Sequence, residues 1–129
     1  MAQSSPKFES GSGPVTCHCP AALTGARFVT VSAAPTGGNP TIAAVAVAGA
    51  KVFGVAVQDA PAASKVAVHA SPGTITTVQA AGAIAVGASV QASANGRAET
   101  LAAGAAVGVA LEAATVADQL ILVALRMGA

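Results

Sequence analysis

The cluster of metal-ligand residue types in this sequence is Cys17-His18-Cys19. In an extended segment the two sulfur atoms would lie on one side and His18 on the other. A closed zinc site requires four ligands, and His69 is the one further histidine that could join them. The cysteines are also too close in sequence for an ordinary structural disulfide. We therefore expect no metal site and no cofactor, and we interpret the cysteines as reduced thiols that are buried or contact a partner.

A second group, Asp59, Ser64 and His69, has the residue types of a nucleophilic triad within one turn and one strand. No serine lies in a Gly-x-Ser-x-Gly sequence, and His69 would share its strand face with Lys65, which is typical of a solvated position. The carboxylates Glu99, Glu112 and Asp118 show no pairing that acid–base catalysis would need. We expect that the protein is not an enzyme.

Two short sequences have interpretations that their context does not support. Residues 84–90 look like a turn and strand of biotinyl or lipoyl carrier domains, but those domains need a lysine at a hairpin tip. None of Lys7, Lys51 and Lys65 has that context. Gly104-x-x-x-Gly108 resembles a helix-packing motif, but Glu112 interrupts the apolar stretch, so we interpret these glycines as strand-entry residues.

The composition is unusual in its charge. The chain has 129 residues, of which 53% are hydrophobic, 9% charged and 2% aromatic, with a formal net charge of +1. Soluble domains carry about 25% charged residues. A chain with so few charges is expected to associate, because little of its surface is strongly hydrated. We therefore interpret the protein as a component of an assembly.

The same composition argues against other partners. No basic stripe is present to neutralise phosphates, and the absence of Tyr and Trp leaves little for bases to stack on, so we expect no nucleic-acid binding. No apolar stretch is long enough to span a membrane, and residues 1–12 do not resemble a signal peptide. We expect a chain that is made and kept in a cytosol, with no membrane partner.

Residues 1–24 differ from the rest of the chain because Ser, Gly and Pro are frequent there. We predict an extended N-terminal arm over 1–24 and a β-rich domain over 25–129. The domain contains an internal repeat, since residues 51–60 align without gaps on 105–114. Continuing that alignment places Val66 and Val68 on Leu120 and Leu122.

The alternation of apolar residues predicts strands. Val66 and Val68 alternate with less apolar residues, and Pro61 would interrupt a helix. The expected fold is mainly β, a small barrel or sandwich of two similar β units. Residues 41–49 and 99–106 remain compatible with short helices.

The order of several Gly-, Ala- and Val-rich sequences resembles the capsid decoration, or cement, proteins of tailed bacteriophages. The sequences that carry this resemblance are Gly25–Val31, Val52–Ala56, Lys65–Val68, Ile84–Val90 and Ala106–Ala114. A glycine usual near the last turn is replaced by Val116-Ala117-Asp118. The resemblance covers about residues 25–125.

The resemblance implies a structural protein on the outer surface of an icosahedral head. Such proteins bind the major capsid protein, bridge its subunits and stabilise the DNA-filled head, often as homotrimers. We expect the arm to contact the capsid or a neighbouring copy through Phe8, Val15, Cys17 and Leu23. The alternative is an independent adhesion or binding module on a virion or cell surface, but a chain with three Phe and no Tyr or Trp offers few recognition residues.

Overall fold

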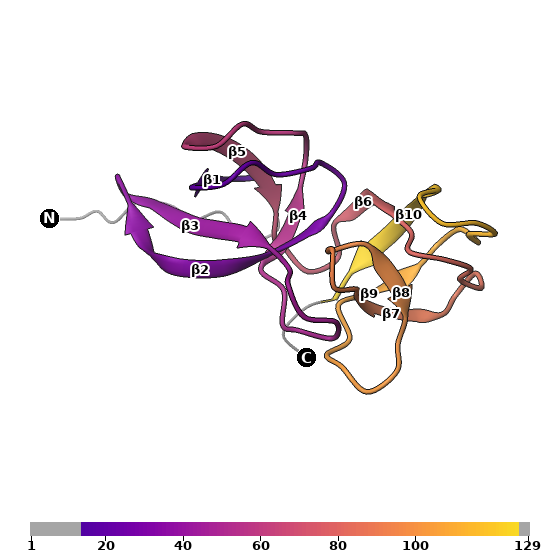
Figure 1. The fold of residues 1–129 in the computed structure, drawn as a ribbon. Helices are drawn as coiled ribbons and strands as arrows, with labels where there is room; N and C mark the ends of the chain where they lie inside the picture. Colours follow the sequence, from indigo (N-terminus) through magenta and orange to yellow (C-terminus); the bar gives the residue numbers. More distant parts are fainter. Residues whose placement is uncertain (1–13, 127–129) are drawn as a thin grey trace, which may run out of the picture.

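The computed structural model describes residues 14–126, and its regular structure is entirely β-strand. The first five strands lie on the left of Figure 1 and the last five on the right. This confirms the expected mainly β fold of two similar units. The strands are β1 (Val15–Cys19), β2 (Phe28–Thr36), β3 (Asn39–Ala44), β4 (Gly54–Ala56), β5 (Ser64–His69), β6 (Ile75–Gln79), β7 (Ser89–Ala92), β8 (Ala98–Thr100), β9 (Gly108–Ala110) and β10 (Leu120–Leu125).

The two units have the same strand connections. The first five strands form a closed barrel in the order β1-β3-β2-β4-β5, and the last five form a sheet in the order β6-β10-β9-β7-β8. In both, the second strand of the unit pairs with the third and the fourth, and the fifth pairs with the first. A parallel bridge between Ala80 and Ala98 joins the two edge strands of the second sheet. We call residues 15–69 repeat 1 and residues 75–125 repeat 2.

Backbone hydrogen bonds repeat in the two units. Leu23 and Ala60 exchange two bonds of 2.9 and 3.0 Å, and Ile84 and Ala114 exchange two bonds of 2.9 Å. The turn before the fifth strand of each unit also contains a residue of positive φ, which is 58° at Ala63 and 68° at Asp118. Asp118 thus adopts the left-handed backbone that a glycine would adopt more easily.

The start of each unit also matches. The sequence suggests an alignment of Gly25-Ala26-Arg27-Phe28 on Gly87-Ala88-Ser89-Val90, and the structure differs from it by one residue. The N–H of Ala26 donates to Ala56 over 2.8 Å, and the N–H of Gly87 donates to Ala110 over 2.7 Å. Both residues have positive φ, 59° at Ala26 and 83° at Gly87. Gly87 therefore corresponds to Ala26 rather than to Gly25.

The expected alignment of β5 with β10 is wrong by one residue. Ala56 pairs with Val68, and its counterpart Ala110 pairs with Val123, so Val68 corresponds to Val123 and not to Leu122. The turn over residues 115–118 holds the extra residue of repeat 2. A slip of one residue moves every side chain of a strand to the other face.

The consequence is visible in burial. Ile121 and Val123 are 1% and 0% exposed, whereas Leu120 and Leu122 are 56% and 40% exposed. The two leucines that the sequence alignment matched with Val66 and Val68, which are buried, therefore lie on the outer face of repeat 2.

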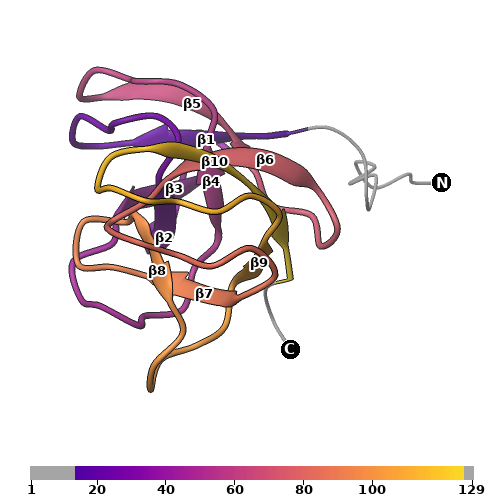
Figure 2. The same cartoon turned by 90° about the vertical axis from the view of Figure 1, so that its right-hand side faces the viewer.

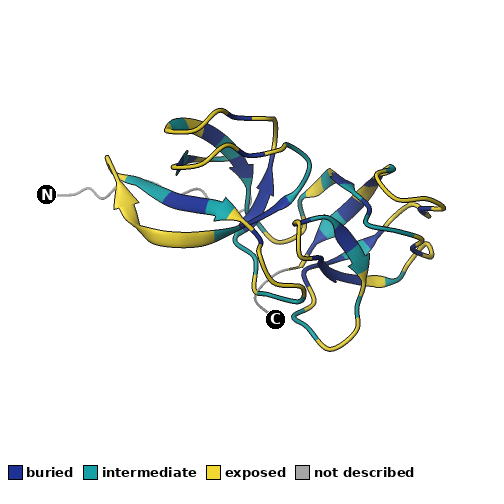
Figure 3. Ribbon diagram, in the orientation of Figure 1, coloured by how far each residue is buried: buried dark blue, intermediate teal, exposed yellow. Residues whose placement is uncertain are grey.

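The two repeats share buried residues where they meet. The core of repeat 1 is formed by nine buried residues: Cys17, Cys19, Leu23, Val29, Ile42, Ala56, Ala60, Val66 and Val68. The core of repeat 2 also includes Phe28, Val45 and Val55 from repeat 1. Figure 3 shows buried residues in the strands of both repeats, while the far end of the β2–β3 hairpin is exposed.

Neither segment that was compatible with a helix is helical. Residues 41–44 belong to β3 and residues 99–100 to β8, and loops follow both strands. Pairing with a neighbouring strand outweighs the helix propensity of alanine here. Residues 14–126 contain no helix (Figure 2), and so none that is long and apolar enough to cross a membrane.

Candidate interaction surfaces

The Cys17-His18-Cys19 sequence forms part of β1 and of the repeat 1 core. Cys17 and Cys19 are both 0% exposed, and both are free thiols. Cys17 pairs with Val66 of β5, as Val78 pairs with Ile121 of β10 in repeat 2. The cysteine therefore occupies a position that valine fills in the other repeat. Both thiols therefore pack in the core of repeat 1.

The surroundings of the thiols fit that role. Cys19 Sγ lies 3.4 Å from the carbonyl oxygens of both Pro61 and Ser64. Burial raises the pKa of the Cys17 thiol from 9.0 to about 11, because the thiolate would lose its hydration. Within residues 14–126, no three His, Cys, Asp or Glu side chains are placed to hold a metal ion.

The residues of the candidate triad take part in local hydrogen bonds and strand pairing. Asp59 Oδ1 accepts a hydrogen bond of 2.7 Å from the N–H of Gly25, and Ser64 Oγ donates one of 2.6 Å to the carbonyl of Pro61. His69 ends β5, opposite Val55 of β4. Asp59 and Ser64 thus make hydrogen bonds that stabilise the connection between β4 and β5.

The residues expected to form an arm divide between two locations. Val15 lies in β1 and is half-buried, Cys17 is buried beside it, and Leu23 is 6% exposed. Phe8 lies outside the described residues. Residues 15–24 thus belong to repeat 1, because β1 pairs with β5 along its whole length and Leu23 bridges to Ala60. Buried side chains at Cys17 and Leu23 are not available to a partner at the surface of this chain.

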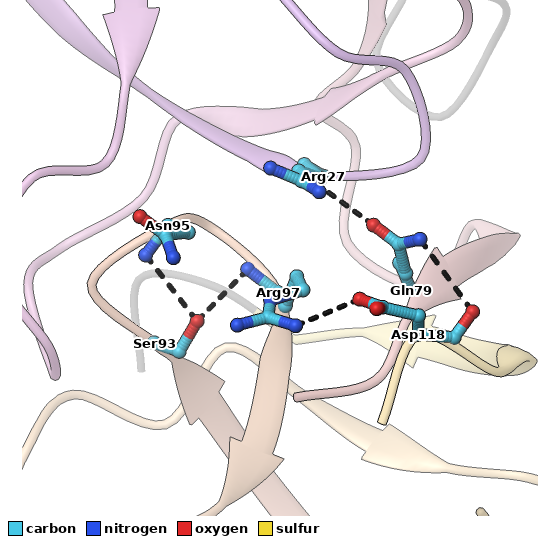
Figure 4. A network of polar contacts seen from close by, with 6 residues as sticks. All are labelled: Arg27, Gln79, Ser93, Asn95, Arg97 and Asp118. Carbon is cyan, nitrogen blue, oxygen red and sulfur yellow. Dashed lines mark hydrogen bonds and ion pairs between the residues drawn. The ribbon is translucent and has the colours of Figure 1, made fainter. Parts of the chain in front are cut away.

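Polar side chains connect the two repeats (Figure 4). Arg27 Nε of repeat 1 donates to Gln79 Oε1 of repeat 2 over 2.9 Å, and Gln79 Nε2 donates to the Asp118 carbonyl over 3.5 Å. Arg97 Nη1 lies 2.7 Å from Asp118 Oδ1. The ion pair is partly exposed, so its own contribution is small, about 0–1 kcal/mol. The Arg27–Gln79 hydrogen bond joins the two repeats, and the contacts of Asp118 hold Gln79 and Arg97 in place within repeat 2.

The same network includes the β7–β8 turn. Ser93 Oγ accepts hydrogen bonds from the N–H groups of Arg97 and Asn95, at 3.1 and 3.4 Å. The N–H of Phe28 donates to the carbonyl of Gly96 in that turn over 2.7 Å. Sequence reasoning missed this contact between repeats, because its partners are distant in sequence and belong to no recognised motif.

The β2–β3 hairpin of repeat 1 is exposed and uncharged. Residues 31–38 are all exposed, and no charged residue occurs from Phe28 to Ala50. The end of the hairpin is held by a 2.8 Å hydrogen bond between the hydroxyls of Thr36 and Thr41. The β7–β8 hairpin of repeat 2 is shorter and its turn packs on repeat 1, so the long hairpin has no counterpart.

Large apolar side chains are also exposed in both repeats. They are Val31, Val47, Val57, Ile75, Val86, Leu111, Val116, Leu120 and Leu122. Single exposed apolar residues are normal on protein surfaces, but contiguous ones indicate binding. These side chains are the large apolar groups that the described surface offers to a partner.

Comparisons with known proteins agree with this description. A family model described as phage cement protein matches residues 10–125. The crystal structure of the head fiber gp8.5 N base of bacteriophage phi29 is similar in fold, with a TM-score of 0.69 and 22% sequence identity. That similarity covers 85% of this chain and 90% of the phi29 chain. A comparison with curated protein sequences finds no match.

Proposed function

Because this chain belongs to the phage cement protein family, we propose that it binds the outer surface of a tailed-phage icosahedral capsid. There it bridges major capsid protein subunits and stabilises the DNA-filled head. The family is one of phage structural proteins, so the chain is a structural protein of the virion. The family match over residues 10–125 is the observation that carries the proposal.

The character of the surface supports adhesion as the mechanism. Only 9% of the residues are charged, and large apolar side chains are exposed in both repeats. Burial of apolar surface contributes about 25 cal/mol per Å², whereas exposed ion pairs contribute little. A protein that binds a capsid by burying surface area therefore gains more binding free energy from these valines and leucines than from its few charges.

Two segments are the candidates for capsid contact. The β2–β3 hairpin is uncharged and exposed over residues 31–38. The residues before β1, including Phe8, form the second candidate. They are the part of the predicted arm over 1–24 that does not belong to repeat 1. We also propose that copies of the chain associate with one another on the head.

The proposal is tested by cosedimentation of the purified chain with undecorated phage heads. We expect saturable binding at a fixed number of copies per capsid subunit, and heads that survive heating better once they are decorated. No binding, together with a stable free monomer, would instead favour the adhesion module as the function.

Truncation separates the contribution of the arm from that of the folded repeats. A chain lacking residues 1–13 keeps β1 and both repeats, and we expect it to bind heads more weakly. A chain lacking residues 127–129 is the matched control, since it also loses only residues outside the described range. Equal capsid affinity for the two truncations would reject the role of the arm.

A further inference from the structure

The turn between β7 and β8 contains the sequence Asn95-Gly96. Asn95 is exposed, and Figure 4 shows it beside Ser93 and Arg97 in this turn. An asparagine followed by glycine cyclises more readily than other pairs, because glycine has no side chain to hinder the attack of its backbone nitrogen. The turn therefore carries a reactive pair that the proposed function does not use.

The fold requires glycine at the second position of this pair. Gly96 has a φ of 78°, a left-handed conformation that glycine adopts without strain. A Cβ atom at Gly96 would also lie 2.5 Å from the carbonyl oxygen of Phe28 in repeat 1. Because no other residue fits at Gly96, the residue before it decides whether the turn is reactive.

The fold does not require asparagine at the first position. The backbone N–H of Asn95 donates to Ser93 Oγ over 3.4 Å, and this contact does not involve the side-chain amide. Asparagine is common in turns, but aspartate and serine serve there as well. The turn therefore tolerates another side chain at Asn95, whereas the close approach of Gly96 to Phe28 leaves little room for a longer backbone.

We propose that Asn95 is a site of spontaneous deamidation. The backbone nitrogen of Gly96 gives up its proton to solvent and attacks Cγ of Asn95. The bond between Cγ and the side-chain nitrogen breaks, and ammonia leaves with a proton taken from solvent. Water then opens the resulting succinimide ring at either of its two carbonyl carbons, which gives aspartate or isoaspartate. Overall, water is consumed, ammonia is released and no electrons are transferred.

Hydrogen bonding in the turn slows this reaction without preventing it. The N–H of Gly96 donates to the carbonyl of Ser93 over 2.9 Å, so the turn must open before the nitrogen can attack. Opening of a surface turn costs less than global unfolding. We therefore expect the folded chain to react at Asn95 more slowly than the same chain in urea.

The isoaspartate product alters the contact between the repeats. In that product the backbone passes through Cβ and Cγ of the former asparagine and is longer by a methylene group. The longer segment still has to join Ser93 to Arg97, which a 2.7 Å backbone hydrogen bond holds together. The extra length displaces Gly96, whose carbonyl accepts a 2.7 Å hydrogen bond from the N–H of Phe28. We expect this hydrogen bond between the repeats to be lost.

The aspartate product changes the charge alone. Either product adds a negative charge, which cancels the formal net charge of +1. The new carboxylate is exposed, and exposed charges contribute little to stability. Asn95→Asp supplies the aspartate product directly, so a comparison with it separates the effect of the longer backbone from the effect of the charge.

Tryptic peptide mapping of the purified full chain after incubation at mildly alkaline pH tests the site. Trypsin places Asn95 in peptide 66–97 and Asn39 in peptide 28–51. We expect the mass gain that replacement of NH₂ by OH produces, assigned to Asn95 by fragmentation, with isoaspartate detected by enzymatic methylation.

The chain offers an internal control for the reaction. Asn39 precedes Pro40, whose nitrogen carries no hydrogen and cannot form the ring. Asn95→Ser is the matched variant, since it keeps a turn residue and removes the amide, and we expect it to gain no mass. Equal modification of Asn39 and Asn95, or an unmodified Asn95 in the folded chain, would overturn the inference.

Amide hydrogen exchange measures the effect on the contact between repeats. We expect the N–H of Phe28 to exchange about tenfold faster in the isoaspartate form than in Asn95→Asp, because it loses its acceptor. Equal exchange rates in the two forms would overturn the structural consequence. These measurements use no phage heads, so their outcome is independent of the proposed capsid binding.

Discussion

Repeat 1 and repeat 2 have the same connections and matching hydrogen bonds, but their outward-facing residues differ. Repeat 1 has His18 and Lys65 where repeat 2 has Gln79 and Leu120. Several inward positions instead hold apolar residues in both repeats, such as Cys17 and Val78. The comparison teaches that the inward residues and the turns specify this fold, while the outward residues are free to differ in function.

The repeats also differ at the hairpin of their second and third strands. In repeat 1 it is long and exposed, whereas in repeat 2 its turn is packed against repeat 1 through Gly96. One copy of the hairpin therefore serves the contact between repeats, and the other is left for a partner. Duplication has produced two scaffolds of one fold, each with a different free surface.

The largest expected effect tests how far repeat 2 depends on repeat 1. Phe28 is 0% exposed and packs in the core of repeat 2, although it belongs to β2. Its counterpart in repeat 2 is Ser89, since Phe28 pairs with Val55 and Ser89 with Val109. We expect Phe28→Ala to lower the free energy of unfolding by about 3–5 kcal/mol, because it leaves a cavity where the repeats meet.

Urea unfolding followed by far-UV circular dichroism measures this effect, since the chain has no Trp or Tyr for fluorescence. Ser89→Ala is the control at the matched position, and we expect it to change the stability by less than about 0.5 kcal/mol. Equal effects of the two substitutions would contradict the assignment of Phe28 to the shared core.

The next effect tests whether both repeats require a glycine where two strands approach each other closely. A Cβ atom on Gly108 would lie 2.7 Å from the carbonyl oxygen of Ala124, and one on Gly54 would be closer still to the carbonyl of His69. We expect Gly54→Ala and Gly108→Ala each to destabilise the protein by about 1–3 kcal/mol, because the backbone must shift.

Gly82→Ala is the control for these two substitutions, because no atom lies within 4 Å of a Cβ at Gly82. Thermal unfolding of the three variants measures the difference. A loss of stability in only one of the two strand variants would show that the repeats are not equivalent at this position.

The sequence predicted the fold class and the duplication better than it predicted the faces of the strands. Val66 and Val68 alternate with Lys65, so one face of β5 is clearly apolar. In β10 every residue from Leu120 to Leu125 is apolar, and a period of two cannot choose a face there. The pairing of β10 with β9 determines which face of β10 is buried. The register of that pairing depends on one extra residue in the turn before β10.

The candidate site residues were predictable only in part, for a similar reason. Cysteine is suited to metal binding, to contact with a partner and to core packing, and its neighbours in sequence do not distinguish these roles. The match of Cys17 with Val78 does distinguish them, but it requires the register of both repeats. Contacts such as that of Phe28 with Gly96 join distant residues, so no local pattern reveals them.

The smallest expected effect concerns Cys17 and its match in repeat 2. Burial raises the pKa of this thiol to about 11 in the folded chain, above its ordinary value of 9.0. The unfolded chain therefore loses the proton at a lower pH than the folded chain does. The stabilising effect is complete below pH 9 and is lost as the pH rises through about 11.

Cys17→Val, which installs the residue of repeat 2, removes this titration. We expect the stability of the wild type to fall more steeply than that of the variant between pH 9 and 11, measured by urea unfolding at each pH. Parallel slopes for wild type and Cys17→Val would mean that the Cys17 thiol is hydrated in the folded chain, and Cys17 would no longer be equivalent to the buried Val78.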